Sequence, residues 1–152
     1  MTRVHQVAIA APLAVGAGAI LCTILIHALA LSAVVNFFRR EIRLGRTGIY
    51  LRDLAIVVLV ISFSVLAHAI EVAVWALLFI ICGEFQQFGA AYYHSAVNYS
   101  TLGYGDMIMS PSWKLLGPLE AADGSLMFGV STAMIFTVIL RLIQSRDANP
   151  GD

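Results

Sequence analysis

Residues 99–106 read Tyr-Ser-Thr-Leu-Gly-Tyr-Gly-Asp, and they lie between two long apolar segments, 54–82 and 116–143. Crossing a bilayer takes about 20 apolar residues, so each flanking segment is long enough to span. An ordinary strand points its successive carbonyls to opposite sides, whereas Gly103 and Gly105 can adopt the positive φ values that realign them. A ring of aligned carbonyls can replace the water shell of a cation. The stretch therefore predicts a loop between two membrane spans whose backbone can turn successive carbonyls to one side.

Composition independently indicates a membrane protein. The chain has 152 residues, of which 60% are hydrophobic and 12% are charged, and its mean hydropathy is +0.87. Soluble domains carry about 25% charged residues. The net charge is zero, so no nucleic acid or other strongly charged partner is expected.

We expect an all-α membrane protein with three transmembrane helices per subunit. The apolar segments run over about 7–38, 54–82 and 116–143. Residues 87–100 are too few to span and are rich in polar and aromatic side chains, which favours a re-entrant helix buried in protein. A secretory signal is the alternative for the first segment, with a cleavage site at 28–30, but its apolar run is about twice the usual length.

The basic residues predict the orientation. Seven of the nine Lys and Arg residues lie after the first span or at and beyond the end of the third, and these are Arg39, Arg40, Arg43, Arg46, Arg52, Arg141 and Arg146. With three spans, both regions lie on one side of the membrane, and positive charge marks the cytoplasmic side. The N-terminus and the loop that ends at Asp106 are then outside.

The stretch from Thr101 to Asp106, T-L-G-Y-G-D, resembles the T-V-G-Y-G-D selectivity filter of the tetrameric potassium channels. Residues 53–143 resemble the outer helix, pore helix, filter and inner helix of the two-helix pore type. The resemblance makes 1–52 an additional N-terminal helix with a basic cytoplasmic loop, and 144–152 a short cytoplasmic tail. It implies a multi-pass cell-membrane protein that is no enzyme: a homotetramer in contact with membrane lipid, with K⁺ as its permeant ion and no organic cofactor.

The resemblance also assigns roles to single residues. Carbonyls of the filter bind K⁺, and the filter residues are Thr101, Leu102, Gly103, Tyr104 and Gly105. Asp106 lies at the outer mouth and concentrates cations, while Tyr93, His94 and Ser100 support the filter. Leu102 replaces the commoner Val, and Val97 stands where several relatives have a carboxylate that bonds the outer Asp. These departures leave open a poorly selective cation channel. A non-conducting regulatory membrane subunit that keeps the fold is the alternative from another class, and the intact filter argues against it.

Two further groups of residues are candidates for control. Gly124, Gly129 and Phe128 lie in the inner helix, where glycine permits bending or close helix packing and a bulky apolar side chain can form a gate. His68 and Glu71 are three residues apart and share a helix face, and His27 lies in the first span. An interhelical hydrogen bond, a proton sensor and a divalent metal site are the three hypotheses for His27, His68 and Glu71.

Overall fold

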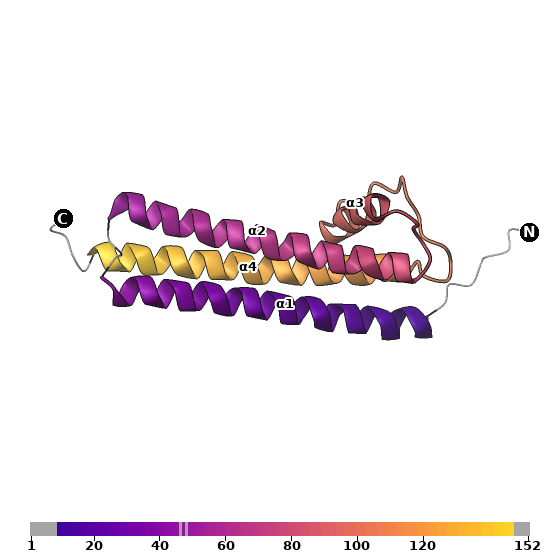
Figure 1. Ribbon diagram of the computed structural model, residues 1–152, viewed down its shortest axis with the longest axis horizontal. Coiled ribbons are helices and arrows are strands. Elements are labelled where there is room, and N and C mark those ends of the chain that lie inside the picture. Colours follow the sequence, from indigo (N-terminus) through magenta and orange to yellow (C-terminus); the bar gives the residue numbers. More distant parts are fainter. Residues whose placement is uncertain (1–8, 46, 48, 148–152) are drawn as a thin grey trace, which may run out of the picture. The chain divides into compact units, whose positions relative to one another are not determined.

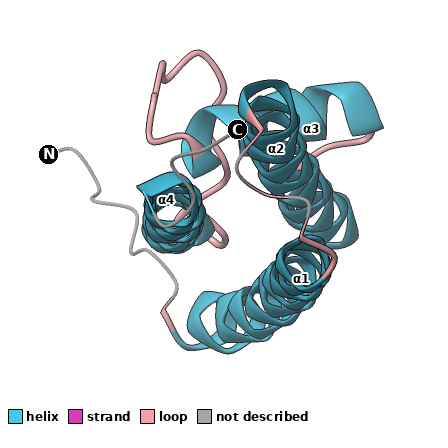
Figure 2. Ribbon diagram, turned by 90° about the vertical axis from the view of Figure 1, so that its left-hand side faces the viewer, coloured by secondary structure: helices cyan, strands magenta, loops and turns pink. Residues whose placement is uncertain are grey.

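The computed structural model describes residues 9–45, 47 and 49–147, and these residues form helices and loops without a strand (Figure 2). The helices are α1 (Ala10–Arg43), α2 (Tyr50–Ile81), α3 (Phe88–Tyr99) and α4 (Leu116–Asp147) (Figure 1). Three of them, α1, α2 and α4, are long and apolar enough to cross a membrane. The protein is therefore an all-α membrane protein, as its composition predicts.

The predicted boundaries are close to the observed ones. The short helix expected over 87–100 is observed at Phe88–Tyr99, and α4 begins at the predicted residue. Helix α1 continues five residues beyond its apolar run to Arg43, and α2 begins four residues early at Tyr50. Charged residues at span ends keep the helix geometry while reaching the aqueous interface. The predicted start of the first span, residue 7, lies outside the described residues.

The chain forms two compact units, each with its own core. The first unit combines the described part of Met1–Leu25 with Ala69–Met127. Its core is built on fully buried aromatic and aliphatic side chains from α2, α3 and α4, among them Trp75, Phe79, Tyr99 and Leu116.

Helix α3 lies beside α2 in the first unit (Figure 1). Two side chains of α3 bond to main-chain carbonyls of α2: the Tyr92 hydroxyl to Ala69 at 3.3 Å and the Ser95 hydroxyl to Val72 at 2.8 Å. These bonds satisfy polar groups that would otherwise be costly in an apolar setting, and they fix α3 along α2.

The second unit comprises Ile26–His68 and the described residues from Phe128 onward. Its core repeats one spacing: each long helix contributes two buried residues four apart, namely Val34 and Phe38, Ile56 and Val60, and Val138 and Leu142. Residues four apart lie on one helix face. These helices also carry exposed apolar side chains, such as Leu59, Phe63 and Leu140, as expected of helices surrounded by lipid.

Gly124 lets α4 approach the end of α3. A Cβ atom added to Gly124 would lie 2.1 Å from the main-chain carbonyl oxygen of Tyr99, whereas one added to Gly129 would meet nothing within 4 Å. Close packing therefore explains Gly124, and Gly129 has no such constraint. A hinge at either position stays a prediction.

We predict that Gly124→Ala destabilises the protein and Gly129→Ala does not. The new methyl group must push α4 away from the α3 backbone, and such overpacking costs about 1–3 kcal/mol. At Gly129 alanine adds only its higher helix propensity, a gain of up to about 1 kcal/mol. Thermal unfolding followed by circular dichroism in detergent measures both. Equal midpoints for the two variants would contradict the contact.

Candidate functional site

In the loop that follows α3, every second residue from Thr101 to Gly105 has a positive φ. φ is positive at Thr101 (60°), Gly103 (58°) and Gly105 (73°). The two glycines behave as their sequence predicts. Thr101 was not expected to do so, because a β-branched residue in this region is strained by about 1–3 kcal/mol.

Helix α3 holds this strained conformation with main-chain hydrogen bonds. The amide of Thr101 donates to Asn98 at 2.8 Å, and the amides of Leu102 and Gly103 both donate to the Val97 carbonyl, at 2.9 and 3.3 Å. The loop therefore continues directly from the last turn of α3. The C-terminus of a helix carries partial negative charge, so this end of α3 favours a cation at the start of the loop.

Tyr93 fastens the far end of the loop to α3. Its hydroxyl donates to Oδ2 of Asp106 at 2.8 Å. This hydrogen bond to the carboxylate is the main cause of a raised Tyr93 pKa, so the phenol remains a donor. Val97 is buried and apolar, and the Tyr93 hydroxyl is the side-chain group that bonds to Asp106.

His94 is buried between two phenylalanine rings. Its ring centroid lies 4.9 Å from that of Phe85 and 5.5 Å from that of Phe79. Nε2 accepts a hydrogen bond from the Asn98 amide nitrogen at 3.0 Å. Burial lowers the His94 pKa, and the amide donor also favours the neutral ring, since a protonated Nε2 could not accept. Ser100, the remaining predicted support, bonds back to the Ala96 carbonyl at 2.6 Å and ends the helix.

We predict that acid destabilises the protein through His94. Because its pKa is lower in the folded state, the unfolded chain binds a proton that the folded chain excludes, and stability falls as pH drops below about 6.5. His94→Phe keeps a packed ring and removes this titration. Thermal midpoints at about pH 7.5 and about pH 5.5 test this. The wild type should lose more than the variant, and equal losses would contradict the role of His94.

Two buried glutamates hold α3 from neighbouring helices of the first unit. Glu71 Oε2 accepts from the Tyr99 hydroxyl at 2.5 Å, and Glu120 Oε1 lies 2.5 Å from the Ser95 hydroxyl. Both carboxyl groups are fully buried. Burial, and then the bond to Glu71, raise the Tyr99 pKa, so Tyr99 stays a donor. The Glu71 contact is an interhelical hydrogen bond, one of the three hypotheses that the sequence left open for this residue.

Asp123 of α4 accepts hydrogen bonds from both α1 and α2 in the first unit. Its Oδ2 accepts from Trp75 Nε1 at 2.9 Å and from the Thr23 hydroxyl at 2.8 Å. Sequence reasoning did not single out Thr23. The available signal was a hydroxyl four residues before His27 in an apolar helix, and residues four apart share a face.

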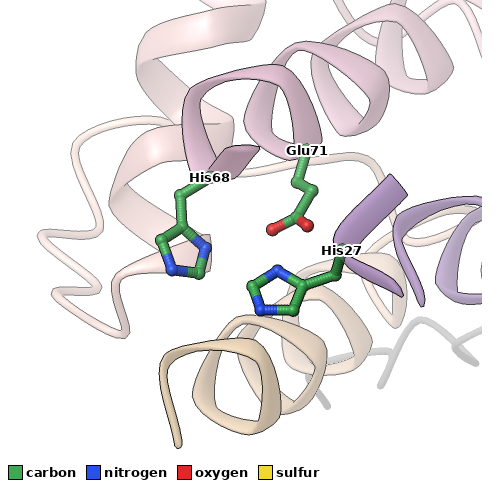
Figure 3. Close-up of side chains that lie close together, drawn as sticks. All are labelled: His27, His68 and Glu71. Carbon is green, nitrogen blue, oxygen red and sulfur yellow. The ribbon is translucent and has the colours of Figure 1, made fainter. Parts of the chain in front are cut away.

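In the second unit, Ser131 bridges His27 and His68. Its hydroxyl oxygen lies 3.2 Å from Nε2 of His27 and 3.1 Å from Nε2 of His68. The two ring centroids are 5.2 Å apart (Figure 3). A serine hydroxyl has one proton and two lone pairs, so it can donate to one imidazole and accept from the other. Ser131 thus ties α1 and α2 to α4.

Phe128, a predicted gate residue, packs against the ring of His68. Its ring centroid lies 4.5 Å from that of His68, and its side chain is 40% exposed. Glu71 follows His68 by one turn of α2 (Figure 3). The proton and metal hypotheses for His27, His68 and Glu71 stay predictions.

We predict that Ser131→Ala destabilises the protein by about 1–3 kcal/mol, because it removes two interhelical hydrogen bonds at a buried position. Thr132→Ala is the matched control, since the Thr132 hydroxyl is exposed and bonds only to the Phe128 carbonyl of its own helix. Thermal unfolding of the two variants provides the measurement. A Ser131→Ala midpoint as high as that of Thr132→Ala would show that the bridge contributes nothing.

One family of known proteins matches the chain. A family model described as "Ion channel" matches residues 55–141, more than half of the chain. The match covers most of α2, all of α3 and its loop, and α4 as far as Arg141, while α1 lies outside it. No curated protein and no solved structure matches the chain.

Proposed function

Because the chain belongs to the ion channel family, we propose that it is a potassium-selective channel that conducts K⁺ passively through a homotetrameric pore. The observation that carries the proposal is the alternation of positive φ at Thr101, Gly103 and Gly105. Alternation of this kind turns successive carbonyls to one side, and a dehydrated cation needs such a row of oxygens. The sequence T-L-G-Y-G-D supplies the residues, and Thr101 adds a hydroxyl at the inner end.

Four copies are needed because one chain contributes one filter segment and the ring closes with four. Two exposed side chains support an assembly: Leu102 is 54% exposed and Tyr104 is 66% exposed in the single chain. Large apolar groups at these positions would pack against neighbouring copies. The outward-packed Tyr104 then sets the diameter of the ring.

In this proposal α3 is the re-entrant pore helix. Its 12 residues extend about 18 Å, too short for a hydrocarbon core of about 30 Å. Its C-terminal partial charge faces a cation at the filter. Asp106 stands at the outer mouth, held by Tyr93, and a ring of such carboxylates concentrates cations there.

The proposed location is the cell membrane, with the N-terminus outside and the C-terminus in the cytoplasm. Among described residues, Arg39, Arg40 and Arg43 end α1, Arg52 begins α2 and Arg141 lies near the end of α4. Arg46 lies outside the described residues. This distribution supports a cytoplasmic face at these helix ends. The pore domain would comprise 53–143, with the α1 region before it.

A poorly selective cation channel is the second candidate. Leu102 favours it, because its exposed side chain must be packed by neighbouring copies and differs in shape from the usual Val. In both cases Phe128, next to Gly129, is the candidate gate. Through the contact between Phe128 and His68, protonation of His68 or metal binding to it would affect this gate.

The test is the reversal potential of purified protein in planar bilayers, with K⁺ on one side and Na⁺ on the other. A value near the K⁺ equilibrium potential is expected. Gly103→Ala should abolish selective current, because alanine at φ 58° is strained. Gly89→Ala, with open space at its Cβ, should conduct like wild type. A wild-type reversal near zero would favour the poorly selective channel, and absent current from an intact tetramer would favour a non-conducting subunit.

A further inference from the structure

An apolar groove lies between α1 and α2 in the second unit. It encloses about 300 Å³ and is lined only by Ala33, Val34, Phe37, Leu59, Val60 and Phe63. All six residues belong to helices that can span a membrane. An apolar concavity on such helices offers a surface suited to lipid chains.

The groove leads toward arginines on both of its walls. On α1, Ala33, Phe37 and Arg40 are spaced four and then three residues apart, so they share one face. Seven residues at 1.5 Å each place Arg40 about 10 Å beyond Ala33 along the helix axis. On α2, Arg52 precedes Leu59 by seven residues and therefore lies on the groove-lining face as well.

An ion pair shows that these two arginines lie at the same end. Arg52 Nε lies 3.8 Å from Oε2 of Glu41, the residue that follows Arg40. Glu41 offsets one positive charge, while the neighbouring Arg39 and Arg43 are exposed and form no ion pair among the described residues. Asp53, buried in the first turn of α2, offsets a second charge, and the four arginines still leave this end of the groove with net positive charge.

We propose that this groove and its arginines bind one anionic phospholipid. One acyl chain lies along Ala33, Phe37 and Phe63, and the phosphate lies between Arg40 and Arg52. Guanidinium groups bind phosphate oxygens in pairs, and the surplus positive charge favours a headgroup with net negative charge over a zwitterionic one. The site uses α1, which lies outside the family match, and it does not depend on the selectivity of the pore.

The first test is native mass spectrometry of the purified full-length protein, titrated with phosphatidylglycerol or phosphatidylcholine of the same chain length. Wild type should retain phosphatidylglycerol more tightly. Arg40→Gln and Arg52→Gln should each weaken its binding about five-fold, with a smaller loss for phosphatidylcholine, whose choline cation offsets its phosphate. Arg141→Gln is the control, because Arg141 is an exposed arginine of α4 outside the groove. Equal affinity for the two lipids, or unchanged binding in both groove variants, overturns the proposal.

A second pair of variants tests the groove itself. Ala33→Trp fills it and should weaken retention of both lipids. Val58→Trp adds the same ring at an exposed position of α2 that does not line the groove, and it should bind like wild type. If Ala33→Trp instead disrupts the oligomer and leaves lipid retained per chain unchanged, the groove holds a neighbouring copy and the proposal is wrong. Binding is measured without ion flux, so a failure of conduction does not bear on it.

Discussion

A short helix among apolar helices is stable only if its polar groups find partners inside the protein, and this constraint governs α3. In a membrane interior each unsatisfied polar group costs several kcal/mol. Helices α2 and α4 supply the partners: Glu71 for the Tyr99 hydroxyl, and Glu120 and the Val72 carbonyl for Ser95. Gly124 then lets α4 touch the α3 backbone. Helix α3 fixes the position of the loop, because the loop amides bond to the Val97 and Asn98 carbonyls.

The local features of this arrangement could be predicted from the sequence. The apolar lengths predicted three spans, the polar aromatic stretch predicted α3 within one or two residues, and glycine predicted positive φ at Gly103 and Gly105. These features depend on neighbouring residues in the chain, which a sequence displays directly. The positive φ of Thr101 was missed, because α3 imposes it through hydrogen bonds against the residue's own preference.

The contacts between helices could be predicted only in part. His27 and His68 stood out as ionisable residues in apolar segments, whereas nothing in the sequence linked them to Ser131, whose hydroxyl lies between them. Its role depends on how three helices are rotated about their axes, and similar hydropathy on all faces leaves that rotation undetermined. The hydrogen bond between Thr23 and Asp123 could not be predicted for the same reason. Helix α1 bonds to α4 in each unit, through Thr23 to Asp123 in one and through His27 to Ser131 in the other, so α1 is bound to the helix proposed to line the pore.

The central claim is that the loop from Thr101 to Gly105 forms a K⁺ site only when several copies meet. A single-particle structure of the purified protein in potassium buffer tests it most directly. The account predicts four copies around one axis, with the loop carbonyls lining that axis and a row of cation density between them. A different number of copies, or loops that do not meet at the axis, would contradict it.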